Sequence, residues 1–358
     1  MLALAKEDRD ANWFTSFGPV KAEEDPRLPT ARFPREKEKR KQTDLFWARH
    51  PLWEEIKVAR SALFVAPPKS GRTAFIWMGR YERRFWGLSP ALSLYLPLDG
   101  PPDKEVLLHS LRNALGESLL CALAEDPFWL LDAPSDYQAR LCSFLINWAG
   151  DPVELFHRMA IRGLREGDPD VRLLRELLLQ YSSSSKDLLG EPEVLSLLEM
   201  ARETLGEAAR YRLRDPTFST FLWVDVKGEK GPGWVRLLQG WERLRQTAHL
   251  KIFTPQDCPF EPRFYLEWRE KDIRNLLEHR WEKVKLDESA WETIRKILMQ
   301  VSTPPEGWED IEWNTMKGHL EDSWEGLREW LVQRAERSPS RLILEGNRLL
   351  ETYGRALK

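Results

Sequence analysis

One segment of the chain has residue types that could bind phosphate. It reads Ala66-Pro-Pro-Lys-Ser-Gly-Arg-Thr73, follows the apolar run 61–66 and precedes apolar positions at helical spacing. In the pattern G-x-x-x-x-G-K-S/T, backbone N–H groups and a helix N-terminus hold phosphate oxygens, the lysine bridges the terminal phosphates and the hydroxyl ligates Mg²⁺. A tight turn that binds nothing would also explain the glycine. The predicted phosphate-binding residues are Ala66, Lys69, Ser70, Gly71, Arg72 and Thr73.

The departures from this pattern affect hydrolysis more than binding. Ala66 replaces the first glycine and Arg72 replaces the lysine, while Lys69 adds a second cation. The planar guanidinium of an arginine keeps the charge but not the geometry of a lysine around a triphosphate. Pro67 and Pro68 each lack a backbone N–H that could point at an anion. We therefore expect that nucleotide binding can survive here where hydrolysis does not.

A second candidate group lies at the end of a later apolar run. The segment Phe218-Ser-Thr-Phe-Leu-Trp-Val-Asp225 is nearly all apolar, as expected for a strand covered on both faces of a parallel sheet, and it ends in an acid. In nucleotide hydrolases such an acid orients Mg²⁺, and a following Glu activates water. The predicted magnesium ligands are therefore Thr73 and Asp225, while Val226 stands where that Glu would be. The alternative is an acid that merely ends a strand at solvent.

Several strands and helices must position these residues. Strands that alternate with helices indicate crossover units and an α/β fold with a parallel sheet. Thr254 ends a strand predicted to lie beside that of Asp225, so its hydroxyl is a candidate sensor of a terminal phosphate, with an ordinary strand-end threonine as the alternative. The predicted strands are 61–66, 91–97, 218–226, 250–254 and 264–266, and one predicted helix is 234–246.

The chain divides into three predicted parts. Residues 1–42 form an extended arm, residues 43–265 the α/β core, and residues 266–358 an all-α domain. Helical spacing of apolar residues at about 104–210 predicts a large helical insertion within the core. The all-α domain has three or four amphipathic helices, and the loop predicted between them contains Trp308 and Trp313 as candidate exposed anchors for a partner.

Taken in chain order, these segments resemble the bacterial STAND and AAA-like P-loop ATPases. The resemblance covers most of the chain outside 104–210 and implies an ATP- and Mg²⁺-binding core under a helical lid domain. It further implies a regulatory switch or scaffold in a multiprotein system such as antiviral defence or signalling. Because Ala66, Arg72 and Val226 depart from the family pattern, the nucleotide or its hydrolysis can have been lost. The matching core segments are Asn12-Trp-Phe14, 61–73, 218–225 and Leu250-Lys-Ile-Phe-Thr-Pro255.

The all-α domain contributes two further candidate cations. The segment 272–281 is similar to the first lid helix of such proteins, which ends in an arginine, and Arg280 matches it. Arg280 lies about two turns after Ile273 and hence within the apolar stripe of the helix. A phosphate would neutralise it there, and the alternative is an arginine that is paired with an acid or extends its charged end to solvent. Ser338-Pro-Ser-Arg341 looks like the Ser-Pro-Arg helix start near the nucleotide, displaced by one residue, so Arg341 is the second candidate.

Composition excludes several classes of function. The 358 residues include 54 Lys and Arg against 57 Asp and Glu, so the net charge of −3 gives no global basic field that would collect nucleic acid. We find no signal-peptide pattern, no run of roughly 18 apolar residues and no C-x-x-C pair, which predicts a cytoplasmic protein without membrane association. The 17 tryptophans are unusually many, and each buried indole N–H needs a partner.

Three other functions fit the sequence less well. Gly87-Leu-Ser-Pro-Ala91 is close to G-x-S-x-G, but it follows a predicted helix and enters a strand, the reverse of a nucleophile elbow. The histidines show no H-x-H or H-E-x-x-H spacing for a metal. The basic run 35–41 leaves an AAA-like nucleic-acid loader as a third, weaker hypothesis, because Glu36 and Glu38 dilute its charge.

Two hypotheses from different classes remain. The first is an ATP-binding regulatory switch or pseudo-ATPase, at most a weak ATPase, whose partners are effector or regulatory proteins. The second is a nucleotide-free protein-interaction scaffold that retains the P-loop fold. Neither hypothesis requires nucleic acid, and both leave a homo-oligomer open.

Overall fold

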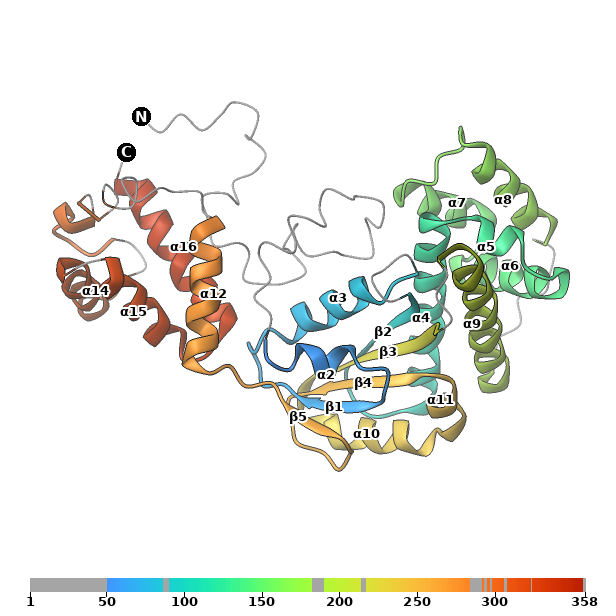
Figure 1. Ribbon diagram of the computed structural model, residues 1–358, viewed down its shortest axis with the longest axis horizontal. Helices are drawn as coiled ribbons and strands as arrows, with labels where there is room; N and C mark the ends of the chain where they lie inside the picture. Colours follow the sequence, from blue (N-terminus) through green and yellow to red (C-terminus); the bar gives the residue numbers. More distant parts are fainter. Residues whose placement is uncertain are drawn as a thin grey trace.

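The computed structural model describes residues 50–85, 90–181, 190–213, 217–283, 292, 295–296, 298–305, 308–322 and 324–356. A β-sheet lies at the centre, with helices of the insertion at one end and the C-terminal helices at the other (Figure 1). The predicted arm 1–42 and the pattern Gly87-Leu-Ser-Pro-Ala91 fall wholly or mainly outside these residues.

Five strands form one all-parallel sheet in the order β2-β3-β4-β1-β5. All five predicted strands are confirmed, because apolar runs bounded by turn residues mark buried parallel strands clearly. The α/β fold class is thereby confirmed at the level of sheet and helices. The strands are β1 (Ala62–Val65), β2 (Ala91–Leu98), β3 (Ser219–Val226), β4 (His249–Thr254) and β5 (Arg263–Tyr265).

Alternate side chains of the strands pack into two separate cores. On β3, Leu222 and Val224 belong to one core, whereas Phe221 and Trp223 belong to the other. Helices α4 (Lys104–Glu125) and α10 (Gly231–Gly240) contribute to the first core, and α2 (Trp53–Lys57) and α3 (Arg72–Glu82) contribute to the second. The crossovers from β1 and from β3 therefore leave on opposite faces of the sheet.

The described residues of the predicted insertion are helical, as expected. Their helices follow β2 and precede β3 along the chain, and α4 packs directly on β2. After α4 come α5 (Phe128–Leu131), α6 (Ser135–Ala149), α7 (Pro152–Ile161), α8 (Pro169–Gln180) and α9 (Glu191–Leu213).

Gly231, Pro232 and Gly233 extend the helix predicted from residue 234 at its N-terminal end. These residues form the first turn of α10, where a proline is tolerated because its missing N–H would have no helical partner. The single helix predicted over 234–246 is also divided, since α10 ends at Gly240 and α11 (Glu242–Thr247) follows.

The C-terminal helices contribute to the second core, the one that also contains α2 and α3. The prediction that Trp308 and Trp313 are exposed loop residues is wrong, because they are 8% and 0% exposed and Trp313 lies in a helix. Trp308 Nε1 donates to Thr352 Oγ1 at 2.8 Å, which satisfies its buried N–H. The helices are α12 (Glu270–Lys283), α14 (Asp310–Asp322), α15 (Trp324–Ala335) and α16 (Pro339–Ala356).

In the described part of the chain, none of the helices combines the length and the apolar character that crossing a membrane requires.

Candidate functional site

The loop predicted to bind phosphate connects β1 to α3 at the carboxyl end of the sheet. Its backbone is distinctive, because Lys69 and Gly71 both have positive φ, 65° and 80°, while the intervening Ser70 does not. A side chain at Gly71 would be strained in this conformation, and even Lys69 adopts it only where the surroundings hold it. Gly71 is also the N-cap residue of α3, and no described side chain caps this helix.

Strand register brings three predicted site residues to one edge of the sheet. Val65, just before the loop, pairs with Thr254 of β4, and Asp225 of β3 pairs with Phe253. The crossovers from β1 and β3 leave on opposite faces with β4 between these strands, and the carboxyl ends of parallel strands at such a change of face form the usual ligand crevice of open α/β sheets. The sheet therefore assembles the loop, Asp225 and Thr254 as predicted from their positions at strand ends.

Asp225 is held by a direct ion pair with the loop. Its Oδ1 lies 2.9 Å from Arg72 Nε, and its carboxylate side chain is 2% exposed. Its other oxygen, Oδ2, accepts a hydrogen bond from Tyr95 of β2 at 3.0 Å. Arg72 also donates from Nη1 to the carbonyl oxygen of Val226 at 3.1 Å. Oδ2 therefore has a hydrogen-bond partner within the protein, whereas Oδ1 lies beside the guanidinium of Arg72 without a hydrogen bond to any described residue.

These contacts weigh against a magnesium ion at Thr73 and Asp225. A magnesium site needs carboxylate or hydroxyl oxygens that face the metal, usually with several waters. Asp225 is instead buried beside a guanidinium, whose positive charge would repel a cation. Among the described residues no group of three or more His, Cys, Asp or Glu side chains is arranged to hold a metal. The residues present do not fit the ion.

Thr254 is placed at the predicted strand end but is already engaged. The residue is fully buried, and its Oγ1 accepts the N–H of Gln256 at 3.2 Å. The backbone of α10 covers this hydroxyl, because a Cβ built at Gly231 would lie only 2.4 Å from it. A role of Thr254 as a phosphate sensor stays a prediction, and it would require these contacts to change.

The C-terminal helices and the segment before them reach the loop directly. Ser338 Oγ donates to the carbonyl oxygen of Lys69 at 3.0 Å, and Pro339, the first residue of α16, approaches Gly71. Trp268 Nε1 donates to the carbonyl oxygen of Ser70 at 2.7 Å. These contacts hold the left-handed backbone of the loop in place.

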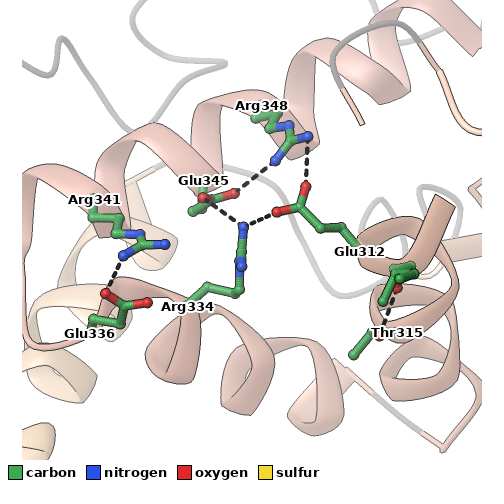
Figure 2. A network of polar contacts seen from close by, with 8 residues as sticks. Glu312, Thr315, Arg334, Glu336, Arg341, Glu345 and Arg348 are labelled. Carbon is green, nitrogen blue, oxygen red and sulfur yellow. Dashed lines mark hydrogen bonds and ion pairs between the residues drawn. The ribbon is translucent and has the colours of Figure 1, made fainter. Parts of the chain in front are cut away.

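Of the two cations predicted in this domain, one is described. Arg341 lies in the first turn of α16, next to the loop contact, and pairs with Glu336 (Figure 2). Farther along α16, Glu345 and Arg348 join the charge network with Glu312 and Arg334 that ties α14, α15 and α16 together (Figure 2). Arg280 lies in α12, but its side chain is outside the described residues.

Three residues of the site were not predicted. Tyr95 is a strand residue whose contact with Asp225 follows from register alone, and Trp268 lies far from the loop in sequence. The ring of His50, 4.9 Å from that of Trp268, is buried, and this burial lowers the pKa of His50. A signal existed only for Trp268, whose indole N–H had to find an acceptor.

Compared with known proteins, the chain matches no family model, no curated protein and no solved structure. The class that fold and site define is that of an α/β protein with a five-stranded parallel sheet and a charged cluster at its carboxyl edge.

Proposed function

We propose that this chain is a nucleotide-binding regulatory switch of the P-loop type that hydrolyses ATP weakly or not at all. The loop backbone carries the proposal. Positive φ at Lys69 and Gly71, on either side of Ser70, gives an alternating backbone of the kind in which N–H groups converge on an anion. The N–H of Ser70 is donated to the carbonyl oxygen of Pro67 at 3.2 Å, so the N–H groups that follow it would hold the anion. The start of α3 adds positive potential at the same place.

Weak or absent hydrolysis follows from the end of β3. Val226 offers no carboxylate to activate water, and its carbonyl oxygen is used by Arg72. Asp225 is neutralised by the same arginine. A bound nucleotide would therefore act as a signal rather than as a substrate.

The switching element of the proposal is the contact between the loop and the C-terminal domain. Ser338 and Trp268 both hold loop carbonyl oxygens, so a phosphate that reorders the loop would alter this contact. A ligand shifts an equilibrium only through such differential contacts. The readout would be a changed surface for other cytoplasmic proteins, such as an effector or a regulatory subunit.

The test is titration of the purified chain with ATP by calorimetry and thermal unfolding. A ligand of the native state at about 100 times its Kd stabilises by ~2.7 kcal/mol, which raises Tm measurably. Gly71→Ala should abolish the effect, because alanine is strained at positive φ. Gly163→Ala is the matched control, since Gly163 has φ of 85° and open space around it but lies outside the site.

The second candidate is a protein-interaction scaffold that has lost the nucleotide. It is favoured by Asp225, whose Oδ2 accepts a hydrogen bond from Tyr95 and whose charge is already balanced by Arg72. No heat and no rise in Tm with ATP in the wild type would leave this candidate and reject the switch.

A further inference from the structure

The charged cluster at the carboxyl edge, formed by Asp225, Arg72 and Tyr95, affects whether a nucleotide could bind there with or without magnesium. Asp225 is the acid that the resemblance assigns to magnesium, yet it faces a guanidinium 2.9 Å away and a phenol 3.0 Å away. A divalent cation at this carboxylate would have to displace Arg72 or lie beside its charge.

Arg72 itself retains binding capacity. A guanidinium has five N–H donors in a planar fork that matches phosphate oxygens. Within the described part of the chain, its contacts use Nε and Nη1, which leaves the N–H groups of Nη2 for a ligand. The side chain, at the start of α3, is 19% exposed, so Arg72 is not fully closed off from solvent.

The loop offers a second group without a partner. Ser70 is 6% exposed, and its buried Oγ has no hydrogen-bond partner among the described residues. It lies between the two left-handed residues of the loop, where backbone N–H groups would converge on an anion. A buried hydroxyl without a partner is costly unless a ligand or water satisfies it.

We infer that this site binds the phosphate chain of a nucleotide without magnesium. The inference rests on the proposed function and specifies its ligand. Arg72, Lys69 and the start of α3 supply the positive charge that Mg²⁺ supplies elsewhere, and Asp225 is the internal counter-ion of Arg72. Phosphate and Asp225 then compete for the charge of one arginine, so removing the carboxylate should strengthen binding.

The experiment compares ATP binding in excess EDTA and in excess Mg²⁺, at equal ionic strength, by calorimetry. For the wild type we expect Kd values that agree within about threefold, well under the tenfold that corresponds to one 1.4 kcal/mol step. Asp225→Asn should bind metal-free ATP about fivefold more tightly, because a competing charge is removed. Asp257→Asn is the matched control, since Asp257 also contacts an arginine and a tyrosine, Arg263 and Tyr265, but is exposed. Its Kd should not change.

Two results would overturn the inference in distinguishable ways. Binding more than about tenfold tighter in Mg²⁺, or lost in Asp225→Asn with its fold intact, would show a metal-orienting acid and leave the nucleotide switch standing. Absence of heat in both buffers would reject the switch and the inference together. Should Asp225→Asn fail to fold, Tyr95→Phe decides, because it frees Oδ2 while Arg72 stays paired. That variant should remain independent of Mg²⁺, and a new magnesium dependence would contradict the inference.

Discussion

Two basic side chains lie toward opposite ends of the same sheet, one partly buried and one fully buried, and they are neutralised differently. Arg72, at the carboxyl end, pairs with the buried carboxylate of Asp225. Lys251 of β4, opposite the first residue of β1, is fully buried and has only carbonyl oxygens as acceptors in the described contacts. Its Nζ donates to the backbone carbonyl oxygens of Val58, at 2.8 Å, and of Glu55, at 3.2 Å, at the end of α2.

The difference separates an exchangeable charge from a structural one. A phosphate could take the place of the carboxylate beside Arg72, and the buried Asp225 would then keep its hydrogen bond from Tyr95 but lose its counter-ion. Carbonyl oxygens at a helix end carry only partial charges, and they belong to the fold itself. Burial, with repulsion from Arg83 and Arg60, lowers the pKa of Lys251 to about 7. Ligand binding is therefore expected at the carboxyl end and pH-dependent stability at the amino end.

The largest expected effect comes from breaking the buried pair. Asp225→Ala should lower the free energy of unfolding by about 3–5 kcal/mol, because Arg72 would keep its charge without a counter-ion. Urea unfolding measures this loss. Asp257→Ala removes a similar but exposed pair with Arg263 and should stay within about 1 kcal/mol. Equal losses of unfolding free energy in the two variants would mean that burial does not strengthen the contribution of the Arg72–Asp225 pair.

The next effect tests the amino end. The folded pKa of Lys251, about 7, lies below its ordinary value of 10.5, so between these pH values the unfolded chain binds more protons. Below pH 7 the protonated Lys251 lowers the free energy of unfolding. As the pH rises above 7 this penalty shrinks, so the free energy of unfolding increases by at most ~1.4 kcal/mol per pH unit. Lys251→Met should remove this rise.

Urea unfolding at pH 7, 8 and 9 measures the prediction for Lys251. The stability of the wild type relative to Lys251→Met should increase across this series, because the facing groups Arg83, Arg60 and Glu55 are present in both proteins. A difference that stays constant with pH would show that the lysine remains protonated throughout and that the carbonyl oxygens fully replace a counter-ion.

Local sequence patterns predict the strands and the loop at the carboxyl end, but not the side-chain contacts made there. The loop and Asp225 could be placed at one edge because each follows an apolar strand, and parallel strands end together. The Arg72–Asp225 pair could not, since the same residues also suit a bound ligand. The burial of Trp313 could not be predicted either, because it depends on the tertiary packing of α14, which contacts α15. Patterns thus specify strands and their ends, whereas side-chain partners depend on register and tertiary packing.

A smaller effect separates the tyrosine from the arginine at the carboxyl end. Tyr95→Phe removes one hydrogen bond to a buried carboxylate, which should lower the free energy of unfolding by about 1.5 kcal/mol. The ion pair with Arg72 remains, so the loss should be well below that of Asp225→Ala. Tyr265→Phe, which removes a comparable bond to exposed Asp257, should cost less than about 0.5 kcal/mol. If Tyr95→Phe lowered the free energy of unfolding as much as Asp225→Ala, the hydrogen bond rather than the ion pair would be the main stabilising contact of Asp225.

The smallest effect concerns the link from the loop to the C-terminal domain. Ser338 Oγ donates to the Lys69 carbonyl and accepts the N–H of Arg341 at 3.3 Å, so it connects the loop to the start of α16. Ser338→Ala should lower the free energy of unfolding by about 1 kcal/mol, as for the loss of a helix cap. Thr315→Ala is the control, because its hydroxyl donates to the Ile311 carbonyl within its own helix, and it should cost less than about 0.5 kcal/mol. Hydrogen exchange adds a local measurement: amide protection around Lys69 should fall in Ser338→Ala and not in Thr315→Ala. If protection there were unchanged, Trp268 alone would hold the loop, and the loop would not pass a phosphate signal through Ser338.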